Sequence, residues 1–518
     1  MQEWKPRHSP WLIAMGVMMA TFMEVLDTSI ANIALPHIAG SLSATPEEAT
    51  WVLTSYLVSN AIVLPTTGWL ANHFGRKRVF ISCIAMFTIA SALCGLAWSL
   101  PTLIFARILQ GIGGGAMVPI AQSIMLESFP RQKRGAAMAI FAQGVVVAPI
   151  LGPTLGGWIT DSYSWRWIFY INLPVGIMAV LAAQWLVEDP PYIQRNKSAT
   201  IDYIGFGLLA VWLATLQILL DKGQEADWFG AVWVRWFTLA SVLSFAGFIW
   251  WQLRAEHPLV DLTVFKNRNF TIGLILMTTL GAILYGTTAQ LPLFLQTLMG
   301  YPALQSGYAM SPRGIAAFVT TFFVGRIVGK VRMRWMLCIG FILLATSSFL
   351  LSNLNLQVSQ INVIWPSVVN GIAISFIFVP LTTATMSQLA QQQLGNATGL
   401  YNLMRNLGGS IGIAFVTTML ARGAQVHQAL MVGHLAPDNP AFRQQFEAAH
   451  KLLANHTDPV TASRQAYNAV YSLLDQQAHL LAFVDNFFIF GALALITMPL
   501  IFLFKRVSAP IKPVATGH

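Results

Sequence analysis

Long apolar segments recur along this chain and are separated by mostly short polar connections. The segments lie at about 11–34, 50–71, 79–98, 102–126, 135–160, 165–187, 204–221, 231–252, 271–293, 304–325, 335–353, 362–386, 398–421 and 482–504. Their lengths are close to the roughly 20 residues that a helix needs to cross a hydrocarbon core about 30 Å thick. The pattern predicts an all-α polytopic membrane protein with about fourteen transmembrane helices.

The polar connections alternate in charge. Lys and Arg gather in every second one, at 76–78, 131–134, 195–197, 254–268, 326–334 and 505–512, and are absent from those near 35–49, 99–101, 294–303 and 354–361. Loops rich in Lys and Arg stay on the cytoplasmic side of a membrane. Both tails, 1–10 and 506–518, are therefore predicted to be cytoplasmic, as an even number of helices also requires. The predicted location is the bacterial inner membrane.

One connection, 422–481, is long and polar and falls on the periplasmic side of the predicted topology. It contains two stripes with helical spacing: Phe442, Phe446, Ala449 and Leu453, and then Tyr467, Val470, Tyr471 and Leu474. Two interpretations follow from these stripes. The segment is either a small cap folded on the membrane part or a docking surface for a partner.

A weak internal repeat divides the chain. The segment Gly68–Arg78 is echoed by Gly325–Arg334, and each joins the second and third helix of a run of six. Repeated halves around a site at the midplane are a common plan for transporters. We therefore expect an N-terminal six-helix bundle at 11–187, a two-helix insertion at 188–270 and a C-terminal six-helix bundle at 271–505.

The composition supports the membrane assignment and argues against other classes. Hydrophobic residues make up 55% of the chain and charged residues 10%, against about 25% charged residues in a soluble domain. The net charge of +10 is spread over loops and tails, so it does not predict a nucleic-acid surface. The three cysteines are widely spaced and lie in apolar segments, which gives no metal site. No phosphate-binding loop and no cofactor motif is present.

Two carboxylates lie deep in the first predicted helix, Glu24 and Asp27. A charge at the centre of a membrane helix costs about 2.5–3.5 kcal/mol on insertion scales. At positions i and i+3 the two acids share one face of the helix. They are interpreted either as groups that handle a proton or a cation, or as a structural ion pair or polar plug.

Arg107 is the predicted partner of these acids. From the expected helix ends, Asp27 lies about 10 Å and Arg107 about 8 Å below the same membrane surface. An arginine beside a carboxylate favours its ionised form, and separating the two favours protonation. The pair can therefore act as a proton switch.

Several motifs carry a resemblance to a known family. GWLANHFGRK from Gly68, RILQGIGGG from Arg107 and GVVVAPILGPTLGG from Gly144 are similar to motifs A, B and C of the major facilitator superfamily. LDTSIANIALP, WRWIFYINLP and DLTVFKNRNF resemble further signatures of its fourteen-helix drug:proton antiporters of the EmrB/QacA type. The resemblance spans nearly the whole chain.

This resemblance implies two six-helix bundles that rock around a central cavity, with the two inserted helices at the periphery. Asp27 and Arg107 would couple transport to protons, and Glu24 would add a second titrating site or favour cationic substrates. Asn72 departs from the acid often found at its position. Motif A would latch the cytoplasmic side through Gly68, Gly75, Arg76 and Lys77. Motif C would contribute Gly144, Gly152, Pro153, Gly156 and Gly157, in a helix interpreted as kinked for packing or bent to set which side opens.

The substrate cavity is predicted from apolar, aromatic and amide side chains and an arginine inside the helices, each interpreted either as a ligand contact or as a packing residue. Arg405 is the strongest candidate, because a second deep cation needs a reason. It could equally pair with a backbone carbonyl. The candidates are Tyr56, Asn60, Met117, Gln143, Tyr285, Gln290, Asn402 and Arg405.

The sequence thus predicts a proton-driven exporter of hydrophobic or amphipathic toxic compounds. The resemblance adds a periplasmic adaptor and an outer-membrane channel as partners. An exporter of one metabolite, fatty acid or siderophore is the alternative on the same fold. A non-transporting sensor or scaffold is the alternative of another class. An enzyme is not expected, because no interfacial cluster of His, Cys or carboxylates is found.

Overall fold

The described part of the molecule is helical throughout. The computed structural model describes residues 6–130, 133–190, 202–256, 258–328, 330–433, 435–436 and 438–505. Within them, the residues outside helices form turns and loops, apart from an isolated bridge between Val328 and Val331. The predicted cytoplasmic tail 506–518, residues 1–5 of the other tail and the connection 191–201 lie outside the described residues.

The predicted spans all coincide with helices. Eleven helices in the described ranges are long and apolar enough to cross a membrane, or twelve when the two arms of bent α8 (Arg134–Ser162) count as one span. Two further predicted segments are helical as well. One is divided into α3 (Trp51–Val63), η1 (Leu64–Thr66) and α4 (Thr67–Phe74), and the other is α14 (Ala303–Ile327).

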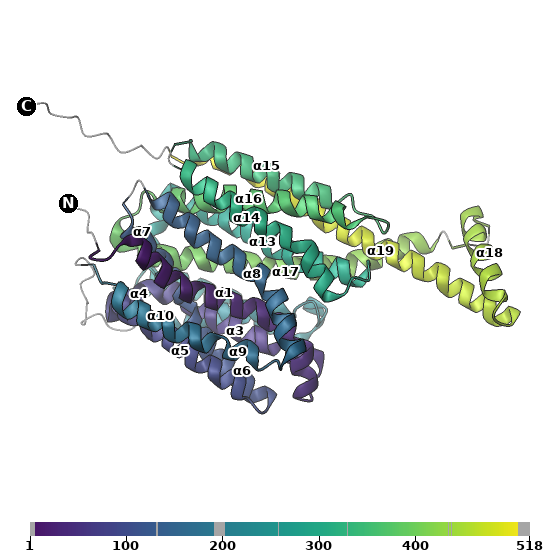
Figure 1. Cartoon of the computed structure of the whole chain (residues 1–518), viewed down its shortest axis with the longest axis horizontal. Helices are drawn as coiled ribbons and strands as arrows, with labels where there is room; N and C mark the ends of the chain where they lie inside the picture. The colour runs from purple at the N-terminus through teal and green to yellow at the C-terminus, as the bar shows by residue number, and fades with distance from the viewer. Residues whose placement is uncertain are drawn as a thin grey trace, which may run out of the picture.

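The helices form two packed groups, here called the N-half and the C-half (Figure 1). In the N-half, α1 packs on α8 and α10, α3 on α6, and α5 on α6 and α10. In the C-half, α13 packs on α17, α16 on α14 and α15, and α19 on α15 and α17. The N-half contains α1 (Pro10–Ser41), α3, α4, α5 (Arg76–Leu96), α6 (Leu100–Gly115), α7 (Met117–Ser128), α8, α9 (Trp167–Tyr170) and α10 (Asn172–Leu186). The C-half contains α13 (Arg268–Thr297), α14, α15 (Met333–Leu351), α16 (Gln360–Met386), α17 (Leu394–Val432) and α19 (Pro459–Thr497).

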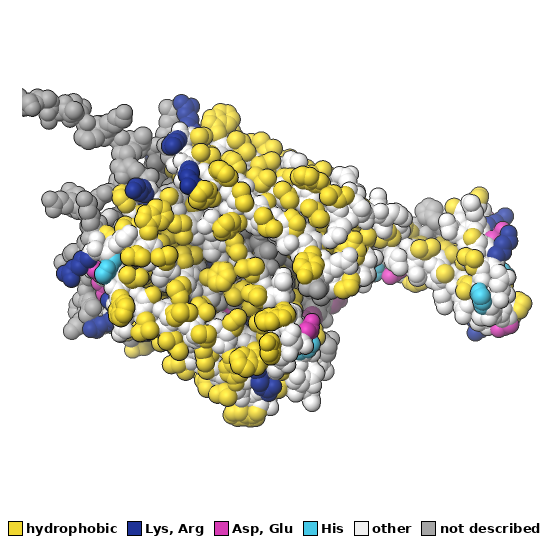
Figure 2. Space-filling model, in the orientation of Figure 1, with side chains coloured by type: hydrophobic (Ala, Val, Ile, Leu, Met, Phe, Trp, Pro, Cys, Tyr) yellow, Lys and Arg dark blue, Asp and Glu magenta, His cyan; other side chains and the backbone are white. Residues whose placement is uncertain are grey.

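The two ends of this bundle differ in charge. Figure 2 shows a broad hydrophobic band, with most Lys and Arg of the visible bundle face gathered at the end opposite the projecting α18. We call this end the basic end and the opposite end the arm end. Arg76 and Lys77 mark the basic end, at the start of α5. A hydrophobic band between polar ends is the surface that a bilayer requires.

The halves meet closely near the basic end. A Cβ atom at Gly68 of α4 would lie 2.7 Å from the backbone of Asn396 in α17, so only a glycine allows this approach. Asn402 of α17 donates to Gln122 of α7 at 2.6 Å. α8 packs along α14 over a long stretch of both helices. The contacts of Gly68 and Asn402 close the space between the halves near the basic end.

The two inserted helices, α11 (Tyr203–Lys222) and α12 (Val232–Gln252), behave differently from each other. α12 is mostly exposed, as the predicted peripheral position requires. α11 instead contacts both halves. Its Gln217 exchanges two hydrogen bonds with Ser410 of α17, at 2.8 and 3.1 Å. Its Lys222 donates to Thr50, beside α3. α11 is nevertheless exposed over most of its surface, so it makes these contacts from the periphery of the bundle.

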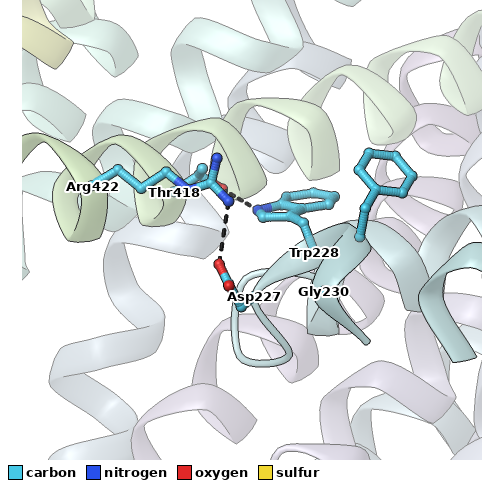
Figure 3. A pocket seen from close by; sticks show the side chains of 6 residues that line it. Asp227, Trp228, Gly230, Thr418 and Arg422 are labelled. Carbon is cyan, nitrogen blue, oxygen red and sulfur yellow. Dashed lines mark hydrogen bonds and ion pairs between the residues drawn. The ribbon is translucent and has the colours of Figure 1, made fainter. Parts of the chain in front are cut away.

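The loop after α11 attaches this helix to the C-half. Trp228 donates from Nε1 to Thr418 of α17 at 3.0 Å, and Arg422 forms an ion pair with Asp227 at 3.3 Å. Asp227 and Trp228 both have a φ of 50°, a left-handed conformation that is uncommon for residues other than glycine. These side chains line an open depression of about 450 Å³, and Figure 3 shows how they lie.

The predicted polar connection forms a helical arm. α18 (Pro440–Ala454) packs on the first part of α19, where the rings of Phe442 and Phe446 contact that of Tyr467 at tilted angles. Both predicted helical stripes are confirmed. Figure 1 shows α18 at the tip of a projection, away from the bundle. The interpretation as a cap folded on the membrane part is therefore wrong.

Candidate functional site

A buried polar network lies inside the N-half, around Asp27. Arg107 of α6 donates from Nη1 to Oδ2 of Asp27 at 2.6 Å. Oδ1 accepts from Gln110 at 2.9 Å and from Asn172 at 2.7 Å. Asp27 is 2% exposed and Arg107 0%. The predicted contact between Asp27 and Arg107 is confirmed, and three donors surround a carboxylate that can only accept when ionised.

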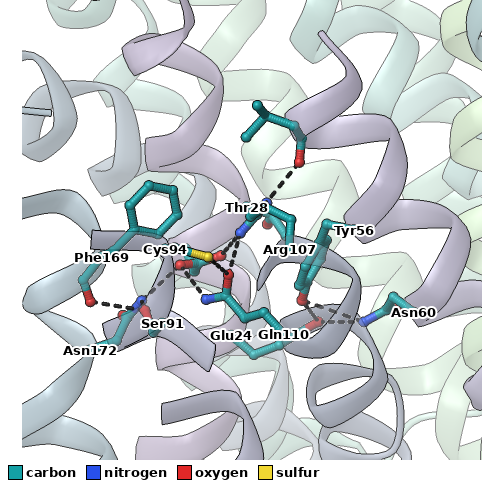
Figure 4. Close-up of polar contacts among 12 residues, drawn as sticks. Glu24, Thr28, Tyr56, Asn60, Ser91, Cys94, Arg107, Gln110, Phe169 and Asn172 are labelled. Carbon is teal, nitrogen blue, oxygen red and sulfur yellow. Dashed lines mark hydrogen bonds and ion pairs between the residues drawn. The ribbon is translucent and has the colours of Figure 1, made fainter. Parts of the chain in front are cut away.

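Arg107 is itself fixed from several sides (Figure 4). It donates from Nε to the carbonyl of Val52 in α3 at 3.0 Å and from Nη1 to Gln110 at 2.8 Å. Its guanidinium lies over the ring of Tyr56, 4.3 Å from the centroid, in the geometry of a cation–π contact. α6 begins at Ser99, where a reciprocal pair of bonds with Thr102 caps the helix. That start places Arg107 two turns inside the helix, at the depth of Asp27.

Glu24 lies one turn away on the same helix and has different partners. Its Oε1 accepts from the hydroxyl of Tyr56 at 2.9 Å and from Asn60 at 3.2 Å. Both donors are neutral and come from α3. Tyr56 therefore contacts both networks, since its ring lies under Arg107 and its hydroxyl donates to Glu24.

Glycines on α6 make these networks possible. A Cβ atom at Gly111 would lie 2.0 Å from Oγ of Ser59, and one at Gly114 would lie 2.7 Å from the hydroxyl of Tyr56. Small residues let two membrane helices approach closely. The glycine cluster in GIGGGA is thus a packing surface against α3, which brings Tyr56 and Asn60 within reach of α1.

The motif A residues lie together at the basic end. Gly75 has a φ of 91° between α4 and α5, which a glycine adopts at little cost. Arg76 follows it and forms a buried ion pair with Glu127 of α7 at 2.8 Å. Lys77 donates from Nζ to the carbonyl of Gln184 at 2.6 Å. The exposed side chain of Asn72 has no role in this ion pair.

The motif C residues line the contact between α8 and α1. A Cβ atom at Gly144 would lie 2.1 Å from Met18, and one at Gly152 would lie 2.3 Å from Ser29. Gly156 also packs closely against α1, whereas Gly157 has open space beside it. α8 bends by 42° between Pro149 and Thr154. The helix includes Pro153, whose side chain lies outside the described residues.

The predicted cavity residues lie in different environments. Tyr56 and Asn60 join the acids, as described above, and Met117 is fully buried in the hydrophobic core. Gln143, Gln290 and Asn402 bond to neighbouring helices, Gln290 to the carbonyl of Phe483 at 2.7 Å and Gln143 to that of Phe318 at 3.4 Å. The ring of Tyr285 packs on Gly409. Arg405 is 5% exposed, and its Nε and Nη1 have no hydrogen-bond partner.

Three site residues were not predicted from the sequence: Gln110, Asn172 and Glu127. Two of them have a signal in the sequence, since Gln110 follows Arg107 by three residues and Asn172 stands in WRWIFYINLP. Glu127 pairs with Arg76 across 51 positions, and nothing local in the sequence marks it. No group of three or more His, Cys, Asp or Glu in the described ranges is placed to hold a metal ion.

Two facing groups of membrane-length helices, with an ion pair buried inside one of them, define a polytopic membrane protein of the secondary-transporter class. The sequence model of the Major Facilitator Superfamily matches residues 17–413. The chain belongs to the major facilitator superfamily.

Similar proteins agree with this assignment. The chain is 36% identical to the fatty acid resistance protein FarB of Neisseria gonorrhoeae, over 95% of this chain and 96% of that protein. It is 38% identical to the multidrug export protein EmrB of Escherichia coli K12, over 85% and 86%. The crystal structure of the human organic anion transporter MFSD10 shares the fold, with a TM-score of 0.62 at 12% identity, and the match covers 96% of this chain and all of that one.

Proposed function

We propose that this protein is a proton-driven exporter of hydrophobic or amphipathic compounds, and not an enzyme. The observation that carries the proposal is the buried ion pair between Asp27 and Arg107. A buried charge pair in a membrane helix bundle marks a pathway for ions or protons. Relatives named for multidrug export and fatty acid resistance support the proposal that transport runs out of the cell.

The hydrogen bonds around Asp27 explain how a proton would act. All three partners present N–H donors to an ionised carboxylate. A protonated carboxyl carries an O–H that needs an acceptor, and the guanidinium of Arg107 cannot provide one. Protonation therefore weakens the contact between α1 and α6. Since Arg107 also holds the Val52 carbonyl, the change reaches α3 as well.

The arrangement of the two halves fits one conformation of a proton-driven transport cycle, the one in which the basic end is closed. Contacts at Gly68 and Asn402 close the basic end. In the proposed orientation the basic end faces the cytoplasm, so substrate cannot enter from that side in this state. Protonation of Asp27 from the arm end would then favour return to a state that opens toward the cytoplasm.

The proposed topology has fourteen membrane spans, with both termini in the cytoplasm of a bacterial inner membrane. The basic end carries the Lys and Arg that a cytoplasmic side requires. The proposed units are an N-terminal bundle at 11–187, an insertion at 188–270 and a C-terminal bundle at 271–505. Motif A would stabilise the closed cytoplasmic side through the ion pair of Arg76 and Glu127.

The arm would then project into the periplasm. Its surface carries exposed apolar side chains on both long helices, among them Val426, Leu430, Tyr467 and Tyr471. We propose that this surface docks a periplasmic adaptor, which would link the exporter to an outer-membrane channel. An arm that projects from the bundle suits such a partner better than a cap would.

The test follows a lipophilic dye in reconstituted vesicles under an imposed pH gradient, with the wild type and Asp27→Asn. We expect gradient-driven dye movement in the wild type and its loss in the variant. Glu24→Gln, on the same face of α1, tests whether the second predicted acid contributes to coupling as well. Equal movement in the wild type and in Asp27→Asn would move proton coupling away from Asp27. No gradient-driven movement of any substrate would refute the exporter.

A further inference from the structure

Among the residues that the structure describes, the C-half contains two buried arginines without a counter-charge in contact. Arg405 of α17 is 5% exposed, and its Nε and Nη1 have no hydrogen-bond partner. Arg313 of α14 is 6% exposed and donates from Nη1 to Thr288 at 3.0 Å, while its Nη2 has no partner. Buried charged groups that lack partners destabilise a protein by several kcal/mol. Two such groups in one half need a reason.

The charges buried elsewhere in the described ranges are already paired. Asp27 pairs with Arg107, Arg76 with Glu127, and Lys222 with Glu225. The buried charges that remain are Glu24, Arg313 and Arg405. Together they leave one net positive charge inside the bundle. An interior with this sign attracts an anion.

Arg405 lies where the two halves face each other. One turn before it on α17, Asn402 bonds to Gln122 of the N-half. Arg405 follows Asn402 by three residues and so lies on the same side of α17 as that contact. The unpaired guanidinium therefore belongs to the side of the C-half that meets the N-half. This junction is where transporters with repeated halves hold their substrates.

We infer that Arg405 binds the anionic head group of an amphipathic substrate, such as a carboxylate or sulfonate on an apolar body. The inference rests on the proposed export function and names the substrate class for it. A guanidinium is a planar fork that matches the two oxygens of such a head group. Arg405 has two N–H positions free for those oxygens. Arg313 adds a second positive charge to the same half.

Glu24 gives this site a second, opposite control. Its charge opposes an anion at Arg405, while Tyr56 and Asn60 hold it in the N-half. Removing the negative charge of Glu24 therefore strengthens anion binding, and removing the positive charge of Arg405 weakens it. For a bound cation the effects are reversed: removing the charge of Glu24 weakens binding, and removing the charge of Arg405 strengthens it. At a site that does not select by charge, neither change would affect anions and cations in opposite directions.

The experiment compares two probes with the same apolar chain and permanent charges of opposite sign, dodecanesulfonate and dodecyltrimethylammonium. Binding is measured in nanodiscs without a gradient, so it does not depend on transport. We expect the wild type to prefer the sulfonate. Arg405→Gln should weaken sulfonate binding about 10- to 100-fold, since hydrogen bonds to charged groups are lost. It should leave dodecyltrimethylammonium binding unchanged or stronger, and Glu24→Gln should strengthen sulfonate binding.

Two controls keep the result interpretable. Arg235→Gln removes one exposed arginine of α12 and should change neither probe. Arg405→Lys keeps the charge without the fork and should weaken sulfonate binding only several-fold, which tests the site if Arg405→Gln does not fold. A wild type that prefers the cation, or an Arg405→Gln variant that weakens both probes equally, would overturn the inference. Gradient-driven dye movement that persists beside either result would leave the exporter itself standing.

Discussion

Asp27 and Glu24 share one face of α1, yet their partners differ in charge. Asp27 is ion-paired with Arg107 at 2.6 Å, whereas Glu24 accepts hydrogen bonds from Tyr56 and Asn60, which are neutral. Asp27→Asn leaves the guanidinium of Arg107 buried without a counter-charge. Glu24→Gln keeps a carbonyl oxygen that can accept both of its bonds. We therefore expect Asp27→Asn to destabilise the protein far more than Glu24→Gln.

The expected magnitudes follow from these partners. Removing one member of a buried ion pair costs about 3–5 kcal/mol. Replacing the Glu24 carboxylate with an amide weakens two hydrogen bonds that involve a charge, which costs about 1–2 kcal/mol. The double variant Asp27→Asn/Arg107→Gln removes both charges. It should recover about 2 kcal/mol of the loss, as expected for residues in direct contact.

The assay is denaturant unfolding in mixed micelles, followed by tryptophan fluorescence, on the wild type and the three variants. The quantity compared is the free energy of unfolding. Equal losses for Asp27→Asn and Glu24→Gln would contradict the reasoning. A double variant that is less stable than Asp27→Asn alone would contradict it as well, because the ion pair would then not be the source of the loss.

Three further outcomes can be checked on the same protein. Gly68→Ala places a Cβ atom 2.7 Å from the backbone of Asn396, so a water-soluble thiol reagent should label Asn396→Cys several-fold faster in that background. Gly157→Ala, with open space beside it, should leave the labelling rate unchanged. Trp228→Phe keeps an aromatic side chain but loses the indole N–H that donates to Thr418 of α17, and should lower the free energy of unfolding by about 1 kcal/mol. The hydroxyl of Thr461, together with the backbone N–H groups of Thr461 and Val460, lowers the pKa of Asp458 at the start of α19. Its stabilising bonds are therefore present above the ordinary carboxyl pKa and are lost as the pH falls through the lowered value, so proteolysis of the arm should accelerate there in the wild type but not in Asp458→Ala.

The sequence predicted the membrane helices because their signal is local. Each apolar segment carries its own evidence of length and composition, and every predicted segment proved helical. The depths of Asp27 and Arg107 could be counted from helix ends, so their contact was also predictable. The chemistry of a deep acid and a deep base needs no knowledge of distant segments.

Features that depend on packing between distant segments could not be predicted in this way. Glu127 stands in a helix with no special spacing to Arg76, so their pairing is visible only in the fold. The bridging role of α11 depends on Gln217 meeting Ser410, 193 positions away. The direction of the arm depends on α17 and α19, which continue as helices beyond their apolar stretches. Hydropathy marks the apolar part of such a helix but does not show that the helix continues through the polar residues beyond it.

The continuity of α19 gives the arm a mechanical property. The helix runs unbroken through 39 residues, Pro459–Thr497. The predicted span 482–504 leaves its first part, 459–481, outside the membrane, which corresponds to a length of about 34 Å. A 10° rotation of the C-half would therefore move the tip of the arm by about 6 Å. A protein bound to the tip would be displaced each time the exporter changes conformation. The tilt of α19 alone would be enough to transmit that change from the membrane part to the bound protein.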